Sequence, residues 1–180
     1  MKKLFLFSVV LLTIITSCTT VAFETPQPKN SDELSEFPQE LIGIYIDKDS
    51  DTLTIKKNSF KYGNKKTTAF HMEEKLTPNK IILKKCEDSF VINLRDTSSN
   101  IWNVFIFKKN KKNILVYYID LGKDNKEEII NNLKDITTAK EIKNKKGEIE
   151  KYIINPTKKE FKLLIDSKIF SKVNEFKQLY

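Results

Sequence analysis

The sequence predicts an α+β fold that is mainly antiparallel β: a meander or small barrel of about eight strands, with two or three amphipathic helices and a hairpin toward the C-terminus. Two observations lead to this prediction. Between residues 41 and 121, short apolar runs alternate with turn residues and leave no room for crossover helices. From residue 123 onward, apolar residues recur twice at helical spacing, with a hairpin pattern between the two segments.

The strand-like runs are short and closely spaced. They cover residues 41–47, 52–57, 59–62, 67–72, 80–86, 89–95, 101–108 and 113–121. Turn residues such as Gly63-Asn64 and Pro78-Asn79 separate them. Because strands joined by such short turns can pair only in the antiparallel direction, we expect a meander that closes or nearly closes into a barrel.

The runs differ in how many of their faces are apolar. In the run 89–95, the two alternating sets are Phe90, Ile92 and Leu94 on one face, and Val91, Asn93 and Arg95 on the other. This alternation predicts one buried face and one solvent-exposed face. The runs 101–108 and 113–121 are apolar on both faces, so another part of the chain must cover their second face.

Residues 123–180 supply candidates for that cover. Capping boxes mark two helix starts, Asp124 with Glu127 and Thr157 with Glu160. The apolar stripes are Ile129, Ile130, Leu133 and Ile136 in the first helix, and Phe161, Leu164, Ile165 and Ile169 in the second. A hairpin between the helices is predicted from residues 139–143 and 148–154. Further apolar residues continue to the C-terminus.

The N-terminus carries the features of a secretion signal. A basic start, Met1-Lys2-Lys3, precedes an uncharged run from Leu4 to Ile15 that is too short to span a bilayer. The following box, Ile15-Thr16-Ser17-Cys18, resembles the lipobox of bacterial lipoproteins, with Ile in place of Leu. The resemblance implies that Cys18 is lipidated and anchors the mature protein to a membrane of the cell envelope. The alternative is an ordinary signal peptide with a chance cysteine.

The segment after Cys18 predicts a flexible connection to the fold. It is polar, lacks apolar periodicity and contains Pro26, Pro28 and Pro38. The predicted organisation is a signal peptide at 1–17, a lipid anchor and flexible tether at 18–38, and one β-rich globular domain at 39–180, with the β-meander at 39–122 and the helices and hairpin at 123–180. Thr19 is not the aspartate that often retains lipoproteins at the inner membrane, so the outer membrane is favoured if the cell has one.

The basic composition does not by itself indicate a nucleic-acid partner. The formal net charge is +8, and removal of residues 1–17 takes away two lysines and no acidic residue, which lowers it to +6. Arg95 is the single arginine among 32 basic residues, although the bidentate guanidinium is the preferred group for phosphate and base recognition. Solvated faces explain the lysines best, and weak attraction to an anionic membrane surface stays open.

A second resemblance concerns the start of the meander. Leu41-Ile42-Gly43-Ile44-Tyr45 is similar to the opening strand of lipocalin-like bacterial lipoproteins, in which a glycine followed two residues later by Trp or Tyr lies near the closed end of the barrel. The resemblance implies an interior that binds a small apolar ligand. Because the strands are short, side chains could equally fill that interior.

The sequence offers little catalytic or metal chemistry. Asp47, Asp49 and Asp51 imitate the start of a calcium loop, but Thr52 and Asn58 replace the glycine and glutamate that such a loop needs, so a polar hairpin turn is the better interpretation. The sequence contains a single histidine, His71. We therefore expect no catalytic residues, no metal and no cofactor.

Large aromatic residues are the remaining candidates for recognition. We single out Trp102 and Tyr117 as possible ligand-binding residues, while Cys86 is expected to be a small buried hydrophobic residue. The favoured hypothesis is a non-catalytic envelope lipoprotein that binds a small apolar ligand or a protein partner. The alternative is a structural or inhibitory module that holds another envelope protein by a sheet edge or a basic surface.

Overall fold

A computed structural model of the chain describes residues 19–63, 71–122 and 125–179, and the following statements concern these residues. The fold is α+β and mainly antiparallel β, as predicted. The elements in chain order are β1 (Thr20–Phe23), β2 (Glu33–Leu34), the 3-10 helix η1 (Gln39–Leu41), β3 (Gly43–Ile46), β4 (Thr52–Lys56), β5 (Ser59–Tyr62), β6 (Met72–Lys75), β7 (Ile81–Cys86), β8 (Ser89–Asp96), β9 (Ile101–Asn110), β10 (Asn113–Tyr118), α1 (Lys126–Ile136), β11 (Ala139–Lys143), β12 (Ile149–Ile154), α2 (Lys158–Asp166) and β13 (Ser171–Gln178).

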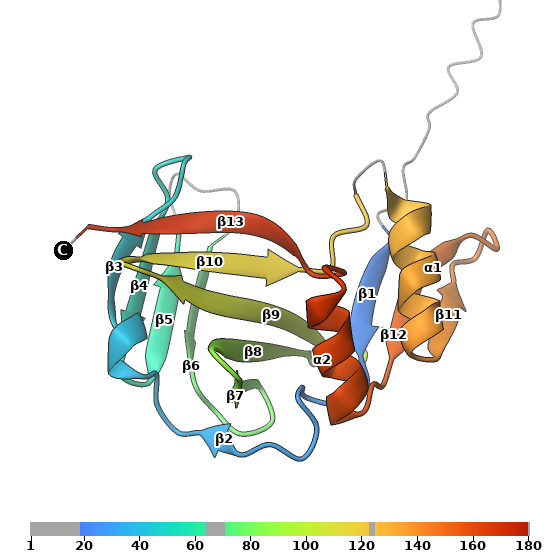
Figure 1. Cartoon of the computed structure of the whole chain (residues 1–180), viewed down its shortest axis with the longest axis horizontal. Helices are drawn as coiled ribbons and strands as arrows, with labels where there is room; N and C mark the ends of the chain where they lie inside the picture. Colours follow the sequence, from blue (N-terminus) through green and yellow to red (C-terminus); the bar gives the residue numbers. More distant parts are fainter. Residues whose placement is uncertain (1–18, 64–70, 123–124, 180) are drawn as a thin grey trace, which may run out of the picture.

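The strands of the described residues form one 13-stranded sheet that curls into a half-barrel, with β11, β12 and β1 attached to it through β9 (Figure 1). β3–β6 form one antiparallel meander and β7–β10 form another. β13 lies between β10 and β3 and joins the two meanders, while β2 pairs with the outer edge of β7. In the described residues no ladder pairs β6 with β7, and only the bridge between Thr77 and Ile81 spans their connection. The sheet therefore stays open along this seam.

The C-terminal residues form a strand, so the described chain has two α-helices rather than three. β13 makes backbone pairs with β10 on one side and with β3 on the other. Phe176 points into the curl and is buried, whereas its neighbours Glu175 and Lys177 do not share that face. Pairing on both sides satisfies backbone groups that each meander would otherwise leave at an edge.

The prediction of a flexible tether is wrong for residues 19–38. β1 pairs in parallel with β12, from Thr20 opposite Lys151 to Phe23 opposite Ile154. Its residues Val21, Ala22 and Phe23 are each 1% exposed. The run is too short to show an apolar period, and its pairing partner lies about 130 residues away in the sequence, so local reasoning could not find it.

The second face of β8 is buried, which corrects the prediction that it is solvent-exposed. Val91 and Asn93 are both fully buried. The Asn93 side chain accepts a hydrogen bond from the Gln27 backbone N–H (2.6 Å) and donates to the Gln27 carbonyl (2.9 Å) and the Ile82 carbonyl (3.2 Å). The segment after β1 therefore covers this face and satisfies the amide that it buries.

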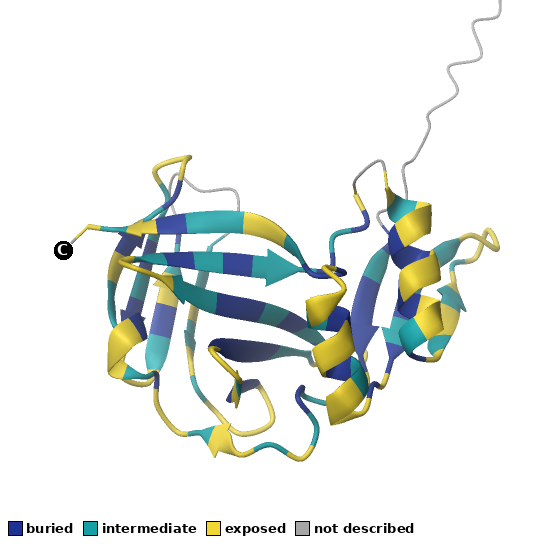
Figure 2. Cartoon of the chain, in the orientation of Figure 1, coloured by how far each residue is buried: buried dark blue, intermediate teal, exposed yellow. Residues whose placement is uncertain are grey.

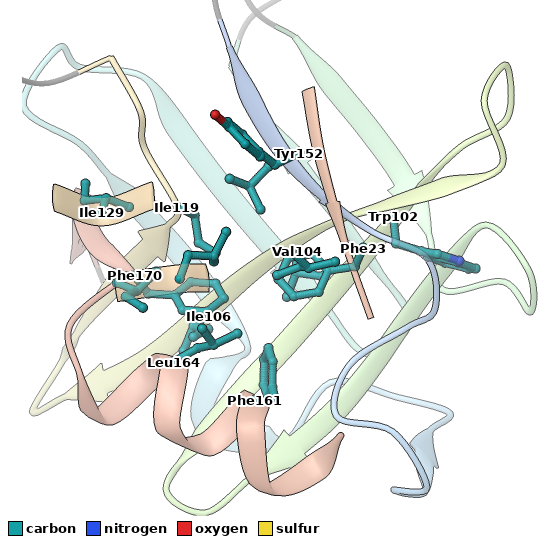
Figure 3. Close-up of a cluster of buried hydrophobic side chains, with 14 of the residues drawn as sticks. Phe23, Trp102, Val104, Ile106, Ile119, Ile129, Tyr152, Phe161, Leu164 and Phe170 are labelled. Carbon is teal, nitrogen blue, oxygen red and sulfur yellow. The ribbon is translucent and has the colours of Figure 1, made fainter. Parts of the chain in front are cut away.

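Two hydrophobic clusters lie on opposite faces of the sheet. One fills part of the curl, and the other lies between the outer face of the sheet, β1, β12 and the two helices (Figures 2 and 3). In the outer cluster the ring of Phe161 contacts those of Phe23 (centroids 6.1 Å apart) and Phe170 (5.8 Å). This confirms that the C-terminal helices cover the second face of the apolar strands.

The structure confirms the capping box predicted at the start of the second helix, α2. The α2 capping box is present, because Thr157 Oγ1 accepts from the Glu160 N–H (3.2 Å) and Glu160 Oε2 accepts from the Thr157 N–H (2.7 Å). Asp124, expected to cap the first helix, lies outside the described residues. The N-cap position of α1 is Asn125, whose side chain makes no capping hydrogen bond.

Phe23 provides a direct test of the role of β1. Phe23→Ala should lower the free energy of unfolding by about 3–5 kcal/mol, because it removes a fully buried ring from the outer cluster. Ser35→Ala, at an exposed position in the same expected tether, is the control and should leave stability nearly unchanged. Urea denaturation measures both, and equal stability of the two variants would mean that the segment is a tether.

Candidate functional site

The candidate functional site is an apolar cavity of about 200 Å³ inside the curled sheet. Its wall is formed by Leu53, Phe60, Tyr62, Met72, Ile92, Leu94, Phe105, Phe107, Val116, Val173, Asn174 and Phe176. Nearly all of these side chains are apolar; those with a polar group are Asn174 and Tyr62. Val173 lines the cavity yet is 42% exposed, so the cavity reaches the protein surface.

The alternation of the strands decides which side chains line this cavity. On β9, Phe105 and Phe107 face the curl, whereas Val104 and Ile106 belong to the outer cluster. On β10, Val116 faces inward in the same way. The curl of the sheet brings these residues opposite those of β4, β5 and β6. A hollow remains because no ladder closes the seam between β6 and β7 in the described chain.

Another part of the interior is tightly packed. Tyr45 is fully buried, its hydroxyl donates to the Leu41 carbonyl (3.0 Å), and the Lys109 ammonium lies 5.0 Å from its ring centre. A Cβ added to Gly43 would lie 3.3 Å from Tyr45 Cε2, so glycine permits this close approach. The pentapeptide that resembles the lipocalin-like opening strand thus builds a packed region, and the cavity lies beside it in the same interior cluster.

A buried carboxylate organises one rim of the cavity. Asp47 Oδ1 accepts from the N–H groups of Asp49 (3.0 Å) and Asp51 (2.9 Å), and Oδ2 accepts from the Tyr62 hydroxyl (2.9 Å) and Asn174 Nδ2 (3.1 Å). These bonds connect the β3–β4 turn to β5 and β13. They fix the two side chains that bring polar atoms to the cavity wall, Tyr62 and Asn174.

The same bonds explain the acidity of Asp47 and confirm the prediction of a polar hairpin turn here. Burial alone would raise the pKa of Asp47, but the hydrogen bonds from Asn174, Asp51, Tyr62 and Asp49 together lower it below its ordinary value. The pKa of Tyr62 is raised by burial and by its bond to the carboxylate. Within the described residues, no three His, Cys, Asp or Glu side chains group as metal ligands.

Trp102 and Tyr117 lie outside the apolar cavity. Trp102 is 6% exposed and belongs to the outer cluster, at one side of it in Figure 3, with the Arg95 guanidinium 5.7 Å from its ring centre. Tyr117 lines a separate hollow of about 210 Å³ beside α2. The rim of that hollow carries ion pairs, Lys162 with Glu87 and Asp166, and Lys108 with Asp88.

Cys86 also lies away from the cavity. Cys86 is partly buried in the hollow beside α2, and burial raises the pKa of its thiol. Its packing against the outer cluster agrees with the predicted role as a small hydrophobic residue. Cys18, the predicted lipidation site, lies outside the described residues.

Comparisons with models of known protein families, with curated proteins and with solved structures found no match for this chain. Among the described helices, neither has the length and apolar character needed to cross a bilayer.

The lowered pKa of Asp47 predicts that the free energy of unfolding depends on pH in the acid range. Its pKa is lower in the folded protein, so its stabilising contribution is present above the ordinary pKa of about 3.9 and is lost as the pH falls through the folded value. Asp47→Asn should cost about 1–3 kcal/mol at neutral pH and weaken the acid dependence of unfolding.

Asp49→Asn, on an exposed carboxylate of the same turn, is the matched control. Chemical denaturation across the acid range measures all three proteins. An Asp47→Asn variant with unchanged stability and an unchanged pH profile would contradict the role assigned to this carboxylate.

Proposed function

We propose that this protein is a non-catalytic lipoprotein of the bacterial cell envelope that binds a small apolar ligand inside its curled sheet. The observation that carries the proposal is the cavity wall, in which phenylalanine, aliphatic and methionine side chains surround a hollow that reaches the surface. The free energy falls when an apolar group displaces water from such a surface. The lipobox-like Ile15-Thr16-Ser17-Cys18 supports the membrane anchor.

The size and polarity of the cavity define the ligand class. Its volume of about 200 Å³ is below the ~300–1,000 Å³ of typical small-molecule sites, whereas an apolar cavity of ~150 Å³ can hold benzene. The ligand we propose is therefore a short aliphatic chain or a single aromatic ring. The two polar side chains of the wall, Asn174 and Tyr62, already donate hydrogen bonds to Asp47, so the wall favours apolar rather than polar groups of the ligand.

The finer assignment, a lipocalin-like barrel, has two supporting features. The consecutive meander strands are joined through β13, and Tyr45 packs against Gly43 beside the hollow. The alternative, a module that holds another protein by a sheet edge, is less favoured. β6, which pairs only with β5 in the described chain, carries exposed Glu73 and Lys75, and charged side chains oppose the addition of another strand.

Blocking the cavity tests ligand binding. Val116→Phe places a larger side chain in the hollow and should abolish binding of a medium-chain fatty acid, and it should remove apolar adducts seen by native mass spectrometry of membrane-purified protein. Leu115→Phe, at the adjacent residue of β10 that does not line the cavity, should retain both. Loss in both variants, or in neither, would contradict binding in this cavity.

Lipidation has a separate test. Cys18→Ala removes the predicted acceptor, so labelling by a fatty-acid probe should disappear and the protein should leave the membrane fraction. Cys86→Ala is the control, since Cys86 is the other cysteine of the chain, and it should change neither property. An unchanged membrane fraction for Cys18→Ala would contradict the anchor.

A further inference from the structure

The fold begins directly after the predicted lipidation site. Thr19 is 7% exposed, and Thr20 already pairs with Lys151 in the sheet. Two residues of extended chain span at most about 7 Å, so Thr20 cannot lie farther than that from the backbone of Cys18. A lipid on Cys18 would hold this edge of the domain at the membrane surface.

The parallel pairing of β1 and β12 determines which residues share that edge. Because both strands run in the same direction, the turn that leads into β12 lies beside the chain that leads into β1. The Thr19 hydroxyl donates to the Ile149 carbonyl at the start of β12 (3.1 Å). Lys126, the first residue of α1, donates through Nζ to the Thr19 hydroxyl (2.7 Å).

This edge carries lysines. The β11–β12 turn presents Lys145 and Lys146, both exposed, next to one acidic residue, Glu148, whose carboxylate accepts from the Asn144 side chain. At the start of α1, Lys126 is bonded to Thr19 and is followed by the exposed acidic residues Glu127 and Glu128, so the exposed lysines of this edge are those of the turn. Figure 1 shows the start of β1, the start of α1 and the β11–β12 turn at one end of the molecule, and the β9–β10 turn at the opposite end.

We infer that this edge, formed by Thr19, the start of α1 and the β11–β12 turn, rests on the membrane and places Lys145 and Lys146 of the turn against anionic lipid headgroups. The inference rests on the proposed function, because it requires a lipid on Cys18. Lysines near an anionic surface are attracted to it, and the attraction decays within a Debye length. The anchor supplies that proximity because no tether separates it from the fold.

The experiment uses the lipidated full-length protein in a Cys86→Ser background, with one fluorophore attached at Lys145→Cys or, as the matched control, at Lys112→Cys. Both positions are exposed lysines on hairpin turns, at opposite ends of the molecule. The proteins are reconstituted into vesicles of phosphatidylethanolamine and phosphatidylglycerol that contain a headgroup nitroxide quencher. Fluorescence at position 145 should be quenched severalfold more than at position 112.

Equal quenching at the two positions, or stronger quenching at 112, would overturn the inference and leave the lipoprotein assignment intact. Replacing phosphatidylglycerol with phosphatidylcholine should lower the quenching at 145 toward the value at 112, and unchanged quenching would contradict the lysine contact. Retention of Cys18→Ser on the same vesicles would instead contradict the proposed anchor, so the two failures can be distinguished.

Discussion

The structure depends on β9, a strand that is apolar on both faces and must be covered on both. Its outward side chains, Trp102, Val104 and Ile106, pack against the cluster formed with β1, β12 and the helices. Its inward side chains, Phe105 and Phe107, face the curl. β9 also pairs with β8, β10 and β1, so one strand sets both the layering of the domain and the wall of its cavity.

The two faces are covered to different degrees. On the outer face, the helices and β1 bring large rings into contact, and Phe23, Phe161 and Phe170 fill the space. On the inner face, cover comes from the sheet bending over itself, and no described ladder joins β6 to β7. The inner cluster therefore leaves a hollow, and its surface is one to which an apolar ligand would bind favourably.

Local patterns predicted much of this fold. Alternation and turn residues located seven of the eight meander strands of the described region, and the Thr157–Glu160 capping box located α2. The exception is β6, which covers Met72–Lys75 and overlaps the predicted run 67–72 only at Met72. Such local patterns could not predict the pairing of strands that lie far apart in the sequence. Val21-Ala22-Phe23 carries no period of its own and becomes a strand only because β12 lies beside it. The exposed face expected for Asn93 is buried for a related reason, since the Gln27 segment returns to cover it.

The candidate site was only partly predictable. A two-faced apolar strand identifies β9 as a strand between two layers, but its sequence does not say which face meets the helices. Their size singles out Trp102 and Tyr117 in the sequence, but the curl of the sheet places Phe105 and Phe107 in the cavity instead. The Asp47 turn was predicted as a polar turn, while its bonds to Tyr62 and Asn174 required the folded sheet.

Methyl NMR of the intact protein, titrated with a medium-chain fatty acid, tests the central claim most directly. Met72, Leu94 and Val116 report on the cavity, and Ile119, Leu133 and Leu164 report on the outer cluster. Ligand binding inside the curled sheet predicts saturable shifts confined to the cavity methyls. Shifts confined to the outer cluster, or no shifts at all, would contradict ligand binding inside the curled sheet.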